Sequence, residues 1–396
     1  MQKRYIKQEQ TGINKRKSLI ITGLGAFLGT FDSSIVNVSL PTISHELSST
    51  MNMTGWIIMS YSITIVSLLL VFGALAEKRG FSFIYSNGFV IFFVGSFLCG
   101  ISASIYFLIL FRVIQGIGAA MLMASGPALI TKSFPENERG RGLSVIAMVV
   151  SVGLMTGPPL GGFITGLLGW RWIFFINIPV CLVGLILTLK FLRNFPIINP
   201  NRKISVPASI TLSATMFSIM ITILMFSRNT TSSEIKYILP IGSLLLIGLF
   251  LYFESNHRTR LVGLDIFKNR IFAFSTTAMF LVFISLASVT ILVPFFLEHI
   301  KFFKPQEVGL FLMTIPICGF FISPVAGYLS DKIQPRYVST FGILVMLSGI
   351  YLLRYLDADT SSLQIILVLV LLGIGMALFT TPNTSAIMGS VQKISL

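Results

Sequence analysis

The sequence predicts an all-α polytopic membrane protein, and three observations lead to this fold class. Of the 396 residues, 54% are hydrophobic and only 11% are charged, and apolar runs of 17 to 26 residues recur along the chain. A soluble domain carries about 25% charged residues, so a water-exposed globular surface is excluded. The runs are continuous, whereas the strands of a transmembrane barrel alternate between apolar and polar side chains, so a β-barrel is excluded as well.

About 20 apolar residues cross a bilayer as an α-helix, and this length marks twelve candidate spans. In chain order they are Leu19–Leu40, Trp56–Ala76, Phe83–Ala103, Phe107–Ile130, Leu143–Ile164, Trp172–Leu192, Val206–Phe226, Tyr237–Phe253, Ile271–Phe296, Val308–Leu329, Val338–Leu356 and Leu363–Met388. The first run follows three basic residues, as a signal sequence does. It is too long for one, contains an acid and lacks a small-residue cleavage site, so we expect it to be the first span.

The basic residues predict the orientation of these spans. The two tails and the even-numbered loops carry 22 of the 29 Lys and Arg residues, and the odd-numbered loops carry six. Because cytoplasmic loops are enriched in Lys and Arg, both termini are predicted to lie in the cytoplasm, with the chain in the cell membrane. The formal charge of +15 therefore reflects topology, and no nucleic-acid partner is expected. Three cysteines (Cys99, Cys181 and Cys318) lie inside apolar runs without metal-ligand spacing, so no metal site is expected.

One acidic residue lies well inside a span. Asp32 is about 20 Å along the first helix from its start at Leu19. An ionised, unpaired carboxylate at that depth costs several kcal/mol. We therefore expect it to bind and release a proton, or to serve as the counter-charge of a cation, with Asn37 in the same site. The alternative is a structural acid that is held neutral by hydrogen bonds to Ser33, Ser34 or Asn37.

The fourth span contains its own charged residue. Arg112 is the one basic residue well inside a span, because Lys190 and Arg354 lie at span ends, and Gln115 follows it one helical turn later. We expect Arg112 to face a central cavity and to tune the proton affinity of the acid. The alternative is that it extends to the outer interface, because it lies roughly 7 Å from the outer end of its helix.

Small residues recur every fourth position on the first and fifth spans. On the fifth span they are Gly153, Gly157 and Gly161, and Pro158 and Pro159 interrupt them. A matching ridge on the first span consists of Gly25, Gly29, Ser33 and Asn37. Small residues at this spacing allow close helix packing, and paired prolines remove backbone donors and kink a helix. The pattern suits either static packing or a surface that slides between two states.

Six motifs in order along the chain resemble those of the major facilitator superfamily. They are Asp32-Ser-Ser-Ile-Val-Asn37-Val-Ser-Leu-Pro41, Gly73-Ala-Leu-Ala-Glu77-Lys78-Arg79-Gly80, Arg112-Val-Ile-Gln115-Gly116-Ile-Gly118, Gly153-Leu-Met-Thr-Gly157-Pro158-Pro159-Leu-Gly161-Gly162, Trp170-Arg171-Trp172-Ile-Phe-Phe-Ile-Asn177-Ile-Pro179 and Gly327-Tyr-Leu-Ser-Asp331-Lys332. The first and fifth are similar to the fourteen-span drug:proton antiporter branch (EmrB/QacA type).

The resemblance implies a role for four of these motifs. The fourth-span motif with Arg112 and Gln115 is assigned to proton coupling, and the fifth-span motif from Gly153 to Gly162 to antiport. The two loop signatures are implied to form a cytoplasmic gate, and their residues are Gly73, Glu77, Arg79, Gly80, Gly327, Asp331 and Lys332. Glu77 stands where the family usually has Asp, and Phe81-Ser82-Phe83 replaces basic residues that normally follow the glycine.

The spacing of the two loop signatures predicts the domain organisation. They lie eight spans apart, whereas two lobes of six spans would place them six apart, so two extra spans are expected between the lobes. We expect a six-span lobe at 1–192, a linker with two extra spans at 193–270, and four spans of a C-terminal lobe at 271–396. The expected architecture is thus a major facilitator fold with an incomplete C-terminal lobe that lacks its last hairpin.

The predicted function is proton-coupled export of lipophilic, cationic drugs or toxic compounds. The expected partners are a small-molecule substrate, protons and the bilayer, with no cofactor besides the proton gradient. Transport of a neutral or anionic compound, uptake by a symporter and a non-functional truncated remnant remain alternatives. An enzyme is not expected, because the three histidines (His45, His257 and His299) are isolated and form no catalytic cluster. A nucleotide-driven pump is disfavoured, because no nucleotide-binding phosphate loop is present.

Overall fold

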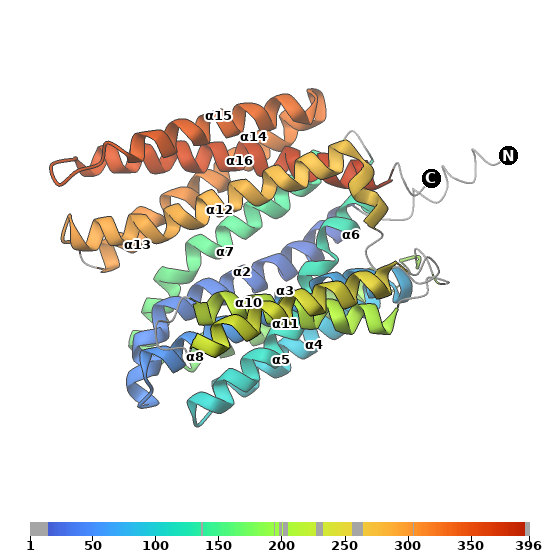
Figure 1. Ribbon diagram of the computed structural model, residues 1–396, viewed down its shortest axis with the longest axis horizontal. Coiled ribbons are helices and arrows are strands. Elements are labelled where there is room, and N and C mark those ends of the chain that lie inside the picture. The colour runs from blue at the N-terminus through green and yellow to red at the C-terminus, as the bar shows by residue number, and fades with distance from the viewer. Residues whose placement is uncertain are drawn as a thin grey trace. The chain divides into compact units, whose positions relative to one another are not determined.

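The structure, a computed structural model, describes residues 15–135, 138–193, 195–197, 200, 205–226, 233–255, 264–303 and 305–392. Within these residues all regular structure is helical (Figure 1). Eleven of the described helical segments are long and apolar enough to cross a membrane. The predicted all-α polytopic fold is therefore confirmed.

The chain forms two compact units, each assembled from segments that are distant in sequence. The first unit comprises described residues within 1–34, 127–159 and 265–396, and the second comprises those within 35–126 and 160–264. Helices α2 (Lys15–Glu46) and α7 (Arg139–Leu168) contribute residues to both units. The predicted domain boundaries at 192 and 270 divide the spans by their order along the chain, and this division stays a prediction.

The second unit is built around α3 (Met51–Arg79), α4 (Phe81–Gly100) and α5 (Ile105–Ala124). Helices α4 and α5 approach closely through glycines, because a Cβ on Gly95 would lie 2.6 Å from the Gln115 Cα atom. The two helices of the predicted insertion, α10 (Val206–Phe226) and α11 (Ser233–Glu254), pack against each other. Helix α10 also contacts α3, where the Ser213 hydroxyl donates to the Ser67 carbonyl at 2.9 Å.

In the first unit, the described residues from 265 onward form most of the short 3-10 helix η2 (Leu264–Lys268) and five α-helices: α12 (Arg270–His299), α13 (Pro305–Leu312), α14 (Thr314–Lys332), α15 (Pro335–Leu353) and α16 (Ser362–Gln392). Helix α16 contacts α12, α14 and α15 (Figure 1). Gly342 and Gly375 allow this close packing, since a Cβ on either residue would lie within 3 Å of the facing helix backbone. Leu369, Leu372 and Phe379 of α16 are buried in the resulting core.

Three predicted spans each contain a short break between two helices, and each still forms one candidate membrane span. The fourth becomes α5 and α6 (Gly126–Ser133), the sixth becomes α8 (Trp172–Phe175) and α9 (Asn177–Phe191), and the tenth becomes α13 and α14. In each case the second helix begins one or two residues before a proline, at Pro127, Pro179 and Pro316. Proline lacks an N–H and clashes with the preceding turn, so it is tolerated in the first turn of a helix and not in its interior.

Candidate functional site

Asp32 lies inside α2 and is completely buried. Its neighbours in the chain, Phe31, Ile35 and Val36, are buried apolar side chains, and Phe31 stacks on Phe27 with ring centroids 5.0 Å apart. The structure therefore places the predicted proton-site residue inside the protein, away from the outer surface.

Other polar residues of α2 lie around Asp32 without all facing it. Asn37 is exposed, and at about 100° per residue it points roughly 140° away from Asp32 around the helix axis. The Ser34 hydroxyl donates to the Leu154 carbonyl of α7 at 3.0 Å. The structure therefore does not bring Asn37 to the face of Asp32, and it directs the Ser34 proton to another helix.

Arg112 of α5 is also completely buried, with its guanidinium enclosed by several helices. Nη1 donates to Oε1 of Gln115 at 2.6 Å, and Nε donates to the Ile57 carbonyl of α3 at 3.2 Å. The guanidinium carbon lies 4.0 Å from the ring centroid of Tyr61, within the range of a cation–π contact. The side chain is therefore held inside the protein and does not extend to the outer interface.

Gln115 links this cation to α4. Its Nε2 donates to the Ser96 hydroxyl at 2.8 Å, while its Oε1 accepts from Arg112. The two predicted coupling residues Arg112 and Gln115 are thus brought together in one network. The sequence did not indicate Tyr61, Ser96 or the Ile57 carbonyl as partners, although Gly95 marks the place where α4 comes close enough to α5 for Ser96 to reach Gln115.

The antiporter motif lies on α7, which runs unbroken through Gly157, Pro158 and Pro159. A Cβ on Gly153 would meet the Thr30 hydroxyl and would lie 3.1 Å from the backbone nitrogen of Phe31 in α2. Further along α7, a Cβ on Gly161 would lie 2.9 Å from the Ile35 carbonyl, and one on Gly162 would lie 3.9 Å from Val38. The glycines at 153 and 161 therefore allow close contact between α7 and α2.

The second loop signature is tied to the start of α7. Asp331 accepts hydrogen bonds from the backbone N–H groups of Gly140 at 2.8 Å and Arg141 at 3.0 Å. A carboxylate at a helix N-terminus satisfies exposed donors and interacts favourably with the helix dipole. A Cβ on Gly327 would lie 2.5 Å from the Gly140 carbonyl, so this contact requires a glycine, and Lys332 lies over the Tyr328 ring at 4.5 Å.

The first loop signature joins α3 to α4. Gly80 has φ +92°, a conformation that glycine adopts without steric cost, and it separates the two helices. Arg79 lies over the Phe83 ring at 5.5 Å, and Glu77 is half-buried near the end of α3. Gly73 lies one turn before Glu77, where a Cβ would be 3.9 Å from the Ala124 carbonyl of α5.

The fifth motif contributes an interaction that the sequence did not indicate. Trp170 Nε1 donates to the Glu46 carboxylate at 2.9 Å, and Arg171 contacts the same carboxylate at 3.4 Å. Arg171 also donates to the Ser102 carbonyl at 3.3 Å. Together these bonds join the end of α2, the loop before α8 and the loop between α4 and α5.

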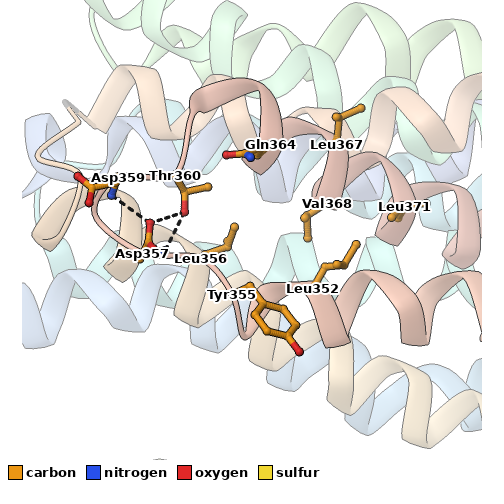
Figure 2. Close-up of a pocket in the computed structure, with 10 residues that line it drawn as sticks. All are labelled: Leu352, Tyr355, Leu356, Asp357, Asp359, Thr360, Gln364, Leu367, Val368 and Leu371. Atoms are coloured by element: carbon orange, nitrogen blue, oxygen red, sulfur yellow. Dashed lines mark hydrogen bonds between the residues drawn. The ribbon is translucent and has the colours of Figure 1, made fainter.

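A pocket of about 500 Å³ lies between α15 and the beginning of α16 (Figure 2). Asp357, Asp359 and Thr360 are at one end of it, where the Thr360 hydroxyl and the Asp359 N–H donate to the Asp357 carboxylate at 2.8 Å and 3.0 Å. Leucine and valine side chains line the other end. None of the residues singled out from the sequence lines this pocket.

Comparisons with known proteins agree with the fold. A family model described as Major Facilitator Superfamily matches residues 22–395. The chain is 32% identical to the riboflavin transporter RibZ of Clostridioides difficile, over 94% of this chain and 80% of that protein. It is 29% identical to the multidrug transporter protein MdtP of Bacillus subtilis, over 99% of this chain and 72% of that protein. It is 28% identical to the multidrug export protein EmrB of Escherichia coli, over 85% of this chain and 67% of that protein.

Two solved structures share the fold at low sequence identity. The proton:xylose symporter XylE aligns with a TM-score of 0.62 at 13% identity, over 95% of this chain and 82% of that one. The human organic anion transporter MFSD10 aligns with a TM-score of 0.61 at 14% identity, over 96% and 90% of the two chains. At this level of identity the likeness concerns the fold alone.

Proposed function

The chain belongs to the Major Facilitator Superfamily, and from this premise we propose that it is a proton-coupled exporter of lipophilic, cationic compounds. It is a multi-pass membrane transporter of small molecules. The observation that carries the finer proposal is the completely buried Asp32 within an apolar membrane helix. Relatives that are named multidrug transporters, among them MdtP and EmrB, support export of drug-like substrates.

The proposed mechanism is competition between a proton and a cationic substrate for Asp32. When the site faces outward, protons enter, neutralise the carboxylate and weaken its attraction for the cation, which leaves. When the site faces the cytoplasm the proton leaves and another cation binds. Each ligand shifts the protein toward the state that it binds more tightly, so exchange follows from electrostatics. A potential of 100 mV supplies about 2.3 kcal/mol for each charge moved across the membrane.

Arg112 has a supporting role in this proposal. Its bonds to Gln115 and to the Ile57 carbonyl hold the positive charge at a fixed place within α3, α4 and α5. A fixed cation in a medium of low dielectric constant acts over longer distances than a solvated one. We propose that it sets the proton affinity of the transport site without itself exchanging a proton, since guanidinium groups stay protonated.

The loop signature and the antiporter motif act on the same helix. Asp331 caps the N-terminus of α7, and the glycines of α7 contact α2, which carries Asp32. We propose that movements of α7 connect the cytoplasmic gate with the proton site. We also propose that the chain belongs to the fourteen-span drug:proton antiporter branch, with both termini in the cytoplasm, on the strength of its motifs and of the bias of Lys and Arg between loops.

A second candidate is transport of a neutral or anionic aromatic metabolite. It is favoured by the 32% identity to a protein named as a riboflavin transporter. The two candidates differ in one observable property: competition at a carboxylate requires a cationic substrate, whereas transport of a flavin-like compound does not.

The test is substrate-evoked collapse of an imposed pH gradient in inverted membrane vesicles that contain the chain. Lipophilic cations and riboflavin are supplied in parallel to the native chain and to Asp32→Asn. Asp265→Asn is the matched control, because Asp265 is an acid in the 3-10 helix η2 that pairs with Lys268 at 2.6 Å. Proton release by cations in the native and control chains, and its loss in Asp32→Asn, is the expected result. Cation-independent activity that persists in Asp32→Asn contradicts the proposal.

A further inference from the structure

The antiporter motif of α7 contains a backbone carbonyl that lacks the regular i+4 hydrogen bond of its own helix. In an α-helix the carbonyl of Leu154 accepts from the N–H of residue 158, which here is Pro158, and the following residue is Pro159. Neither proline has an N–H to donate. An unsatisfied carbonyl is costly in the membrane interior, so a donor from outside the helix is needed.

Ser34 of α2 supplies this donor. Its hydroxyl lies 3.0 Å from the Leu154 oxygen, and the serine is buried. The neighbouring contact, one turn earlier on α2, is made by Gly153 against Thr30 and Phe31. A glycine allows close approach but offers no side chain to hold the partner helix in one rotation. The hydrogen bond from Ser34 holds α2 in one rotation, since it requires the hydroxyl to point at one particular carbonyl.

The rotation of α2 determines where Asp32 points. Asp32 and Ser34 are two residues apart, so they lie on roughly opposite sides of the helix. When Ser34 is fastened to α7, the carboxyl group is directed away from α7. We propose that Ser34 is a positioning residue for Asp32, and that its bond to the carbonyl left by Pro158 couples the antiporter motif to the proton site. The coupling part of this inference rests on the proposed function, and the positioning part does not.

The contact itself is tested by thermal unfolding of four purified chains: native, Ser34→Ala, Pro158→Ala and the double variant. In Pro158→Ala the new N–H donates to Leu154, so the hydroxyl becomes redundant. We expect Ser34→Ala to lower the unfolding midpoint in the native background and to have a smaller effect in the Pro158→Ala background. Equal effects in both backgrounds overturn the contact. The matched control is Ser39→Ala, which removes a hydroxyl bridge from α2 to Thr165 of α7 that involves no proline, and its effect is expected to be the same in both backgrounds.

The positioning of Asp32 is tested by the rate at which dicyclohexylcarbodiimide, an apolar carboxyl reagent, modifies it, followed by mass spectrometry. This readout requires no transport. Ser34→Ala is expected to change the rate about fivefold, the factor that corresponds to loss of one neutral hydrogen bond, and Ser39→Ala to change it less than twofold. Rates that are unchanged in Ser34→Ala, or changed equally in both variants, overturn the inference.

The coupling of Ser34 to proton-driven transport is tested in the vesicle assay. Uphill, proton-driven transport in Ser34→Ala is expected to fall about fivefold, while downhill substrate movement changes less than twofold. An equal fall in both rates indicates a merely structural serine and overturns the coupling. If the native chain moves no protons while the carbodiimide rate responds to Ser34→Ala, the proposed function fails and the positioning role of Ser34 stands.

Discussion

Replacement of Arg112 by methionine removes a buried cation while keeping most of the side-chain length. The Ile57 carbonyl and Oε1 of Gln115 both lose a charged donor, at about 1–3 kcal/mol each. They keep the weaker donors Ser60 at 3.4 Å and Cys99 at 3.9 Å, respectively. The contact with the Tyr61 ring is lost as well, at roughly 0.5–2 kcal/mol. The methionine recovers some apolar packing. The lost hydrogen bonds and ring contact, less this recovered packing, give an expected net loss of about 3–5 kcal/mol.

The assay is thermal unfolding in detergent, followed by size-exclusion chromatography. For a chain of this size a loss of 1 kcal/mol lowers the midpoint by roughly 1 °C, so Arg112→Met is expected to lower it by about 5 °C. The matched control is Arg171→Met. Arg171 also bonds a carbonyl and stacks on an aromatic ring, at 4.3 Å from the Trp170 centroid, but its side chain is 40% exposed. Solvent screens such contacts, and the control is expected to lose only about 1 °C.

A double variant, Arg112→Met with Gln115→Leu, tests the reasoning further. Because both partners of the shared hydrogen bond are removed together, its loss is expected to be smaller than the sum of the two single losses by roughly 1–3 kcal/mol. Equal midpoints for Arg112→Met and Arg171→Met refute the claim that burial makes the Arg112 network costly to break. Simple additivity of Arg112→Met and Gln115→Leu refutes the claim that the two residues act together.

Three further predictions follow from the described contacts. Gly95→Ala is expected to destabilise the chain by about 1–3 kcal/mol, because its Cβ would lie 2.6 Å from the α5 backbone. Gly166→Ala is the control and is expected to be neutral in the same thermal assay, because a Cβ there would meet nothing within 4 Å. Asp331→Asn is expected to weaken the cap on α7 by about 1 kcal/mol and to speed hydrogen exchange in the first turn of that helix, and unchanged exchange contradicts it. The Thr360 hydroxyl holds the pKa of Asp357 below its ordinary value. This hydrogen bond therefore stabilises the loop above about pH 4, and the stabilisation is lost as the pH falls through the depressed pKa. Thr360→Val is expected to raise the pKa of Asp357 in an NMR titration of labelled aspartate.

Proline shows where sequence reasoning about this fold succeeds and where it stops. Pro127, Pro179 and Pro316 each lie in the first turn of a new helix, while Pro158 and Pro159 lie within a helix that continues. All five look alike to a rule that scores residues locally. What differs is the surroundings: α7 continues through its prolines where Ser34 of α2 satisfies the Leu154 carbonyl. The outcome depends on a residue 120 positions away in the chain.

The same distinction between what the sequence indicates and what the tertiary structure adds applies to the candidate site. That Asp32 and Arg112 would be unusual was evident from the sequence, because charged residues inside apolar runs are rare and costly. Their partners were not evident, since the Ile57 carbonyl is 55 residues from Arg112 and the contact requires α3 and α5 to be neighbours. Asn37 was predicted to join Asp32, but the helix turns it to an exposed face, because five residues do not complete a whole number of turns.

The sequence by itself thus determined the membrane class, the approximate spans, the family and the two buried charges. Hydropathy, the bias of basic residues and short motifs are properties of neighbouring residues, so they can be evaluated without a structure. Only the tertiary structure decided which helices break, which glycines are pressed against another backbone and which group satisfies each buried donor or acceptor. These depend on segments that are distant in the chain, and a buried polar group is stable only where such a segment supplies its partner.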